Sequence, residues 1–133
     1  MSGRLLIAGA LAAVLGGVLA VTVAAHTDRY PSDIDITAGI SSSYVYGGLD
    51  SPRASCEPDR KVKLYRKKPG SDRLIDSTKS IANSGGATWT IEFSSAPPAG
   101  NYYSKARKRD LAPGDGHSHI CQGAASNLVP LGP

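Results

Sequence analysis

The stretch Thr88-Trp89-Thr90-Ile91-Glu92-Phe93 decides the fold class of this 133-residue chain. Its three apolar side chains alternate with two threonines and a glutamate, which gives the period of two that a half-buried β-strand requires. Most of these residues are β-branched or aromatic and therefore favour a strand. Because no convincing stripe with the helical period of 3.6 residues follows residue 25, we expect an all-β domain.

The same alternation recurs in two segments that flank this strand. Residues 60–66 place Val62 and Leu64 on one face with lysines on the other, and residues 101–107 place Tyr102 at an inward position. Further strands are expected at residues 34–40, 44–46, 74–81 and about 120–129, and turns at residues 47–52, 69–70, 83–86 and 110–118. About seven short strands separated by such turns predict an antiparallel β-sandwich whose core contains these apolar side chains.

Residues 1–25 differ from the rest of the sequence. Arg4 precedes an apolar run over residues 5–25, and small residues stand at the two positions that a signal peptidase reads before His26. This pattern predicts an N-terminal hydrophobic signal helix that is cleaved on export. The same run is long enough to span a bilayer as an uncleaved membrane anchor. Both alternatives predict a secreted, extracellular or periplasmic domain.

Length and composition limit what the remaining chain can be. The whole sequence is 41% hydrophobic and 20% charged with a net charge of +4, and because Arg4 is the only charged residue of the leader, the rest carries +3. We expect residues 26–33 to form an N-terminal tail and residues 34–130 to form the β-sandwich domain. A domain of this size excludes a two-domain enzyme, a TIM barrel and a complete dinucleotide-binding fold.

The two cysteines, Cys56 and Cys121, both follow the leader. In an oxidising compartment, an even pair of cysteines in a small domain predicts a disulfide. The bridge would close a loop of about 65 residues and stabilise the fold by roughly 4 kcal/mol on the chain-entropy model. The alternative, a metal-binding or catalytic thiol pair, lacks the close C-x-x-C spacing that such sites use.

The order of several motifs resembles a group of exported bacterial Ig-like domains and, more broadly, the carboxypeptidase-regulatory, transthyretin-like sandwiches. The matching segments are Ile40-Ser41-Ser42, residues 56–65, the Gly85-Gly86 turn with Trp89-Thr90-Ile91, Ala99-Gly100-Asn101-Tyr102-Tyr103, and Cys121. In those domains a V-x-L strand, a G-x-W/F strand and a P-x-G-x-Y corner recur in this order. The resemblance implies a non-catalytic module, often an accessory to surface or extracellular proteins, and it transfers no catalytic residues.

The sequence shows no recognisable constellation of an enzyme site. Its aspartates are scattered over loops and outward positions, whereas a glycosidase holds two carboxylates across a cleft. No G-x-S-x-G elbow occurs, and Gly47-Gly48 and Gly85-Gly86 lack the helix and lysine of a phosphate-binding loop. We therefore expect a protein without enzymatic activity or a required cofactor, and with an unidentified partner outside the cell or in its envelope.

Three histidines offer metal binding as an alternative function. Cleavage before His26 would free an amine that chelates a metal together with its own imidazole, and His117 or His119, beside Asp115, would complete a copper(II) site. This outline resembles exported copper carriers of the periplasmic resistance type, which combine a mature N-terminal histidine, an A-G-x-Y corner (here Ala99 to Tyr102) and a late D-x-H motif. The competing interpretation is that all three histidines are solvated.

Basic side chains provide a candidate contact surface. The expected outward residues are Lys61, Lys63 and Lys67 on one strand, and Tyr103, Lys105, Arg107 and Arg109 on another. Because like charges directly opposite each other destabilise a sheet, we expect the two rows to be separated or offset by acids such as Glu92. Such a face would suit an anionic wall polymer or lipid surface, and export argues against nucleic acid. The alternative is that these side chains provide solubility and protect sheet edges, which the modest net charge favours.

Overall fold

The computed structural model describes residues 26–113 and 116–133, and this part of the chain is all-β apart from two short 3-10 turns. The predicted signal helix at residues 1–25 and the predicted ligand Asp115 lie outside the described residues. Within the described ranges, no helix is long and apolar enough to cross a membrane.

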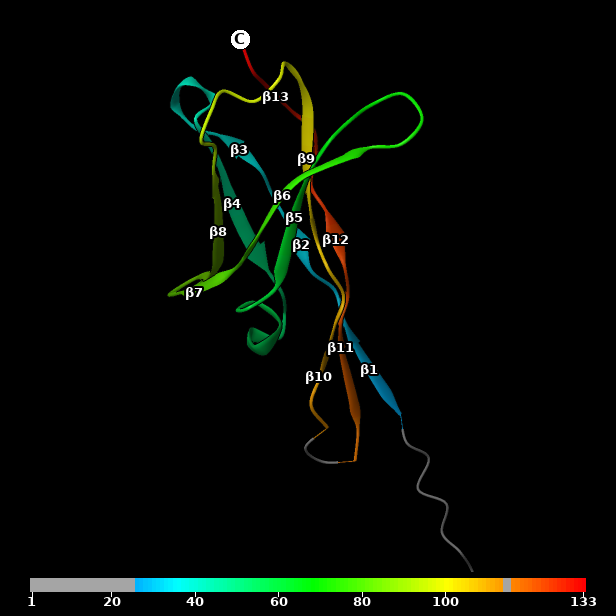
Figure 1. Cartoon of the computed structure of the whole chain (residues 1–133). Coiled ribbons are helices and arrows are strands. Elements are labelled where there is room, and N and C mark those ends of the chain that lie inside the picture. The colour runs from blue at the N-terminus through cyan, green and yellow to red at the C-terminus, as the bar shows by residue number, and fades with distance from the viewer. Residues whose placement is uncertain (1–25, 114–115) are drawn as a thin grey trace, which may run out of the picture.

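The described ranges contain thirteen strands, most of them short (Figure 1). They are β1 (Thr27–Tyr30), β2 (Asp33–Ile34), β3 (Thr37–Ala38), β4 (Tyr44–Asp50), β5 (Lys61–Arg66), β6 (Arg73–Lys79), β7 (Ile81–Asn83), β8 (Gly86–Glu92), β9 (Gly100–Ala106), β10 (Arg109–Leu111), β11 (Ser118–Cys121), β12 (Ala124–Ala125) and β13 (Val129–Leu131). The two 3-10 turns are η1 (Ile40–Ser42) and η2 (Ala54–Cys56).

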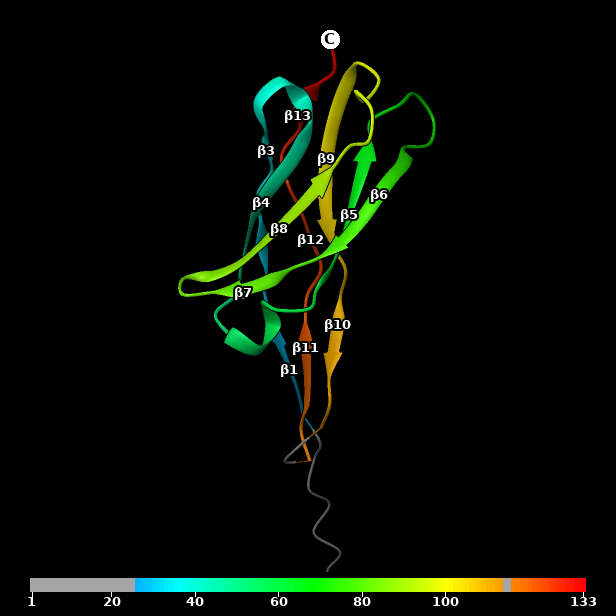
Figure 2. The ribbon, with the colours of Figure 1, turned by 60° about the vertical axis from the view of Figure 1, so that its left-hand side comes forward.

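Two five-stranded sheets form the main body of the molecule. One has the strand order β2-β4-β8-β7, with β3 also paired to β4, and the other has the order β12-β9-β5-β6, with β13 also paired to β9. Every pairing within these two sheets is antiparallel. Figures 1 and 2 show the two sheets as separate layers. The prediction of an all-β fold is therefore confirmed, and the two main sheets are antiparallel as expected.

The core lies between the inner faces of the two sheets. Trp89 and Ile91 of β8 contribute from one sheet, and Val62 and Leu64 of β5 and Tyr102 of β9 contribute from the other. All five side chains are buried, as their alternation in the sequence predicts. The lysines that alternate with Val62 and Leu64 consequently face away from the core.

Strand β4 runs through Gly47 and Gly48, where the sequence predicts a turn-rich loop. A Cβ atom on Gly47 would lie only 2.2 Å from the backbone oxygen of Asp35, so the segment between β2 and β3 approaches β4 too closely for a side chain. The Asp35 carboxylate also accepts a hydrogen bond from the Gly48 amide (2.7 Å). These glycines therefore permit a close backbone approach within a strand, and they do not form a turn.

The strand expected at residues 34–40 is also interrupted. It is divided into β2 and β3, and Ile40 lies in η1 with 81% of its surface exposed. Ser41 and Ser42 adopt positive φ angles of 56° and 51°, which a strand does not allow. Phe93, expected in the core, follows the end of β8 and is only partly buried against it.

A third sheet of three strands extends from one end of the two layers (Figures 1 and 2). Its order is β1-β11-β10, and β1 runs parallel to β11. The sequence predicts a tail at residues 26–33 and one long strand at about residues 120–129. Instead, β1 occupies part of the expected tail, and the expected final strand is divided among β11, β12 and β13. A parallel pairing between two distant, polar segments leaves no periodic signal that the sequence could show.

Cys56 and Cys121 form the predicted disulfide, which joins η2 to β11. Both cysteines are fully buried, and their Cα atoms are 5.4 Å apart. A buried bridge of this kind is typical of proteins that mature in an oxidising compartment.

Arg60 lies next to this bridge and is fully buried. Its guanidinium donates hydrogen bonds to the backbone carbonyls of Cys56 (2.8 Å), Arg107 (2.7 and 3.1 Å) and Gln122 (2.8 Å). Burial, and to a smaller extent the charge of Arg109, lowers the pKa of Arg60 from its ordinary value. The side chain therefore joins the ends of η2, β9 and β11 through their carbonyl groups.

Candidate functional site

The outer face of the β12-β9-β5-β6 sheet carries a group of basic side chains, here called the cationic face. Its members are Lys61 and Lys63 of β5, Lys79 of β6, Lys105 of β9 and Arg107, which follows β9. Lys63 is partly exposed and the other four are exposed. Their neighbours in sequence on β5 and β9 are buried, so the basic side chains point into solvent.

The strand register places these charges in two rows across the sheet. Lys63 is directly opposite Lys105, and Lys61 is directly opposite Lys79. Arg107 extends the second row, because its amide donates a hydrogen bond to the carbonyl of Lys61 (2.9 Å). Directly opposed residues have Cβ atoms about 5 Å apart, so the rows bring like charges close together.

The described carboxylates do not pair with the basic side chains of these rows. Among the described residues, none of the five members of the cationic face forms an ion pair. Glu92, expected to offset them, lies on β8 of the other sheet, opposite Tyr44. The expectation that the basic side chains of residues 61–67 and 103–109 are separated from each other or offset by acids is therefore wrong for Lys63 and Lys105.

Two residues expected on this surface have other roles. Arg109 lies on β10 of the three-stranded sheet, where its guanidinium donates to the carbonyls of Pro58 (2.7 Å) and Ser55. The Lys67 ammonium pairs with Asp72 (3.3 Å) beyond the end of β5. Strand β5 ends at Arg66, so the strand alternation on which the placement of Lys67 depended stops before this residue.

Two tyrosines continue the outer face beyond the rows of basic side chains. Tyr65 of β5 is directly opposite Tyr103 of β9, and their rings stack with centroids 5.5 Å apart at an angle of 18°. The Lys105 ammonium lies 5.5 and 5.6 Å from the two ring centroids, within the range of a cation–π interaction. This tyrosine pair, partly exposed at both rings, joins directly onto the cationic face.

Asp72 fixes one ring of the tyrosine pair. The Tyr103 hydroxyl donates a hydrogen bond to the Asp72 carboxylate (2.7 Å), which also accepts one from the Lys68 amide (3.2 Å). Burial, then the hydrogen bond to Asp72 and the charges of Asp72 and Tyr65, raises the pKa of Tyr103 to about 12. The same hydrogen bond, followed by that from the Lys68 amide, lowers the pKa of Asp72. At neutral pH the ring is therefore held in one orientation as a neutral donor.

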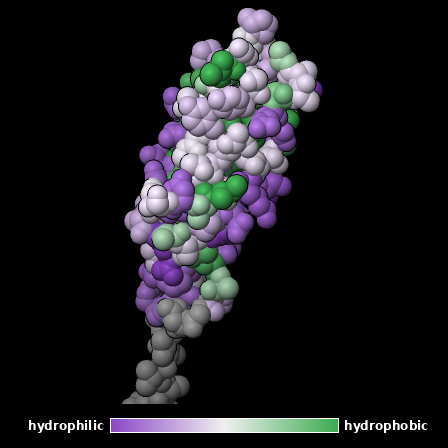
Figure 3. Space-filling view, turned by 90° about the vertical axis from the view of Figure 1, so that its left-hand side faces the viewer, coloured by the Kyte–Doolittle hydropathy of each residue, from purple (hydrophilic) through white to green (hydrophobic). Residues whose placement is uncertain are grey.

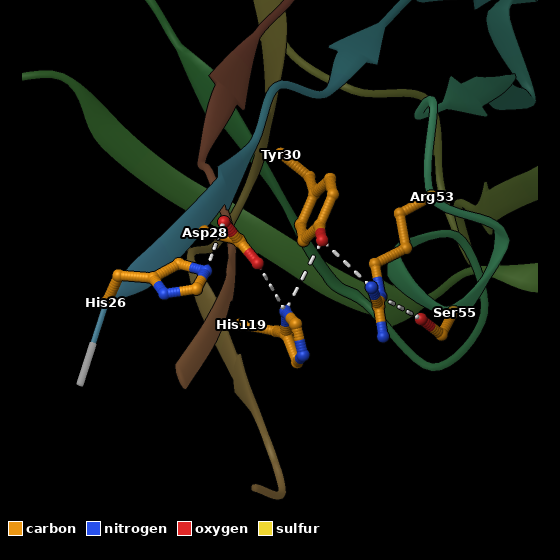
Figure 4. A network of polar contacts seen from close by, with 6 residues as sticks. All are labelled: His26, Asp28, Tyr30, Arg53, Ser55 and His119. Atoms are coloured by element: carbon orange, nitrogen blue, oxygen red, sulfur yellow. Dashed lines mark hydrogen bonds and ion pairs between the residues drawn. The ribbon is translucent and has the colours of Figure 1, made fainter. Parts of the chain in front are cut away.

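A histidine cluster lies at the far end of the molecule, on the three-stranded sheet (Figure 4). The parallel register of β1 and β11 places Asp28 directly opposite His119, and it brings His26 and His117 together just before these strands begin. The rings of His26 and His117 are 4.1 Å apart between centroids. The Asp28 carboxylate lies between two of the imidazoles, 3.7 Å from Nε2 of His26 and 3.5 Å from Nδ1 of His119.

A chain of polar contacts leads from this cluster to η2 (Figure 4). The Tyr30 hydroxyl is 3.3 Å from Nδ1 of His119, and it accepts a hydrogen bond from Nη1 of Arg53 (2.9 Å). Nε of Arg53 donates to the Ser55 hydroxyl (3.0 Å). These contacts connect the β1 strand to the segment that carries the disulfide.

The three predicted metal ligands His26, His117 and His119 thus gather at one end of the three-stranded sheet. Within residues 26–113 and 116–133, however, no three histidine, cysteine or carboxylate side chains are arranged to hold one metal ion. The fourth predicted ligand, Asp115, is outside these ranges. The copper site therefore stays a prediction that depends on groups beyond the described side chains.

One cavity, of about 320 Å³, lies between the ends of β2 and β4 and the η2 segment. Its lining contains three carboxylates, from Asp33, Asp50 and Glu57. Both hydroxyl groups of the lining form hydrogen bonds within the protein. Ser51 donates to the carbonyl of Pro31 (2.9 Å), and Ser32 accepts a hydrogen bond from Arg60 (3.0 Å). The described lining thus lacks the paired nucleophile and base of a hydrolytic site.

Sequence reasoning missed several residues of these two surfaces. Lys79 and Tyr65 lie on strands where alternation gives their direction, but only the strand order shows that Lys79 is opposite Lys61 and that Tyr65 lies beside Lys105. Asp28 and Tyr30 fall in a segment without a strand pattern, so their contact with His119 has no signal in the sequence.

Figure 3 shows the side that carries β4 and β8, where hydrophobic residues form separate spots among hydrophilic ones.

The chain matches no protein-family model and no curated protein, so its function has to be inferred from these residues and their geometry.

Proposed function

We propose that this protein is an exported, non-enzymatic interaction module that binds an anionic polymer of the cell envelope through its cationic face. The observation that supports this most is the direct opposition of Lys63 and Lys105 on an exposed sheet face, where neither lysine forms an ion pair with another described residue. A polymer with repeated negative charges would neutralise both rows at once.

The electrostatics of the face explain why a polymer suits it better than a single small anion. Each opposed pair of like charges destabilises the sheet by a few tenths of a kcal/mol or more. Anions bound along the rows would remove this repulsion, and neighbouring rows would bind successive charges of one chain. Because the groups are exposed, salt would screen the interaction strongly.

The proposed location and fold type rest on further observations. The buried Cys56–Cys121 bridge favours maturation in an extracellular or periplasmic compartment. Two packed antiparallel sheets, together with the motif order of the sequence, support an Ig-like or transthyretin-like sandwich. An exported module of this type would meet envelope polymers directly after secretion.

A binding experiment with three charge variants tests the proposal. The purified protein, recovered from an oxidising export compartment, is titrated with polygalacturonate and with inorganic polyphosphate at low and at physiological salt. We expect binding to both polymers at low salt, with affinity that falls as salt rises, and a loss of about tenfold in the Lys63→Gln/Lys105→Gln double variant.

Lys108→Gln is the matched control for that experiment, because Lys108 is exposed, lies off the cationic face and pairs with Asp110 (3.5 Å). It removes one positive charge and should reduce affinity by less than about twofold. Absence of binding at low salt, or equal losses in Lys63→Gln and Lys108→Gln single variants, would contradict the proposed function.

Copper binding is a second candidate, favoured by the 4.1 Å separation of the His26 and His117 rings. If the mature chain begins at His26, its amine and imidazole would supply two donors and a neighbouring imidazole a third. Titration of the secreted protein with copper(II) should then produce a visible d–d absorption band that disappears in His26→Gln. A mature N-terminus at any other residue would exclude this chelate.

A further inference from the structure

We infer that the ligand of the cationic face is an acidic polysaccharide, whose sugar rings stack on the tyrosine pair while its anionic groups contact the lysines. This inference rests on the proposed function and specifies the chemistry of the polymer. The observation that carries it is the continuity of the two features, since Tyr65 follows Lys63 at the next outward position of β5 and Tyr103 precedes Lys105 in the same way on β9.

The two rings of the tyrosine pair stack on each other and are partly exposed, so each has one face and its edge left for contact with a sugar ring. The rings are nearly parallel, and hydrogen bonding to Asp72 holds the Tyr103 ring in place before any ligand arrives. Leu74 of β6 is directly opposite Tyr65 and is 48% exposed, so it extends this apolar strip across a third strand. Aromatic rings with an apolar body and a polar tip are suited to partners that are both apolar and hydroxylated.

The lysine that contacts both rings links the two parts of the site. The Lys105 ammonium lies within 5.6 Å of each tyrosine centroid and is directly opposite Lys63. In a polymer whose sugar rings each carry an acidic group, every apolar ring face has an anionic charge beside it. This arrangement matches the tyrosine rings with the Lys105 ammonium beside them. A polyphosphate chain presents charge alone and would leave the apolar strip uncovered.

An anionic membrane surface fits the same charges less well. Apolar side chains that protrude beside the basic ones strengthen binding to a membrane surface. Among the described residues, the two most exposed large apolar ones, Ile40 (81%) and Ile81 (72%), lie in η1 and on β7 of the other sheet, whereas the apolar residue beside the tyrosine pair, Leu74, is less exposed (48%). The tyrosines beside the lysines are only partly exposed, so they form a surface for contact and not for insertion.

The experiment compares three probes on the oxidised, exported protein. The probes are polygalacturonate, inorganic polyphosphate at the same charge concentration, and vesicles of phosphatidylglycerol with phosphatidylcholine. We expect the wild-type protein to bind polygalacturonate more tightly than polyphosphate or vesicles. Tyr65→Thr should weaken polygalacturonate binding about fivefold and change polyphosphate binding by less than about twofold, because only the ring contact is lost.

Two control variants separate the stacking contact from effects on folding. Tyr65→Phe keeps the ring and should bind both polymers as the wild type does. Tyr46→Thr changes an exposed tyrosine of the other sheet and should leave both affinities unchanged. Thermal unfolding of each variant shows whether the sheet is intact.

Each outcome bears on one proposal. Equal losses for both polymers in folded Tyr65→Thr, or no loss for either, would overturn the stacking inference and leave the proposed anionic-polymer binding standing. Tighter binding to vesicles than to polygalacturonate would replace the polysaccharide with a lipid surface. Absence of wild-type binding to both polymers at low salt would instead overturn the proposed function itself.

Discussion

Lys63 and Lys105 are directly opposite each other on the outer face of a sheet, and neither forms an ion pair in the described part of the chain. Replacing one charge should therefore stabilise the fold. We expect Lys63→Gln to raise the free energy of unfolding by a few tenths of a kcal/mol at low salt, and to lose this advantage at high salt, where the repulsion is screened. Urea unfolding at two salt concentrations measures the difference.

The control is a lysine that pairs with an acidic side chain. Lys108→Gln removes the same charge from a side chain that pairs with Asp110, so it should leave stability unchanged or slightly lower. Destabilisation by Lys63→Gln at low salt would contradict the claim that repulsion across the strands is present.

Arg60 should be the basic residue whose loss is most harmful to folding. Arg60→Met would leave the carbonyls of Cys56, Arg107 and Gln122 without their donors in a buried site, and we expect it to lower the free energy of unfolding by about 3 kcal/mol. Arg60→Lys should recover little, because one ammonium cannot reproduce the fork of the guanidinium.

Arg73→Met is the control for this prediction, since Arg73 is an exposed residue of β6. It should change stability by less than about 0.5 kcal/mol. Similar effects of the Arg60 and Arg73 substitutions in urea unfolding would show that the buried guanidinium is not a structural link.

Gly47 should not tolerate a side chain, although it lies in the interior of a strand. Its Cβ would lie 2.2 Å from the Asp35 backbone oxygen, so Gly47→Ala must displace backbone and should cost more than about 2 kcal/mol of stability. Gly85→Ala, at a glycine with no heavy atom near the added Cβ, should be tolerated within about 0.5 kcal/mol. Equal melting temperatures for the two variants would contradict the close approach at β4.

Tyr103 should make stability fall at alkaline pH. Its folded-state pKa of about 12 lies above the unfolded value near 10, so the folded protein retains a proton that the unfolded chain loses between these values. Stability associated with Tyr103 is therefore present below about pH 10 and is lost as the pH rises toward about 12.

Tyr103→Phe tests this coupling with two measurements. In the alkaline absorbance titration of the variant, the tyrosine that ionises near pH 12 should be missing. The pKa of Asp72 should rise toward its ordinary value, because its largest stabilising contact is the Tyr103 hydroxyl. If the pKa of Asp72, followed by NMR of its side-chain carboxyl carbon, is the same in the variant, the hydrogen bond is absent in solution.

Sequence patterns predicted the parts of this fold that depend on local alternation. Trp89, Val62 and Leu64 reveal their direction because their neighbours are polar, and the disulfide of Cys56 and Cys121 follows from their number and context. Arg60 belongs to one of these alternating segments, yet its burial depends on carbonyls from distant segments that no local pattern reports.

The order of the strands determines which outward side chains of the candidate site are neighbours, and the sequence does not show this order. Alternation places Lys63 and Lys105 on outward positions, but whether they are neighbours depends on the pairing of β5 with β9. Repulsion between like charges predicted that the basic side chains of the two strands are not neighbours. The parallel pairing of β1 with β11, which brings His26 near His117, likewise joins segments that are far apart in sequence and lack a strand pattern.

The most direct test of the account is a map of backbone amide chemical shifts during titration of the exported protein with polygalacturonate at low salt. Binding through the cationic face predicts shifts concentrated on residues 61–65 of β5, residues 103–107 at the end of β9 and residues 77–79 of β6. These shifts should vanish when salt is added. Shifts confined to the histidine cluster or to β4 and β8, or no shifts at all, would contradict binding through the cationic face.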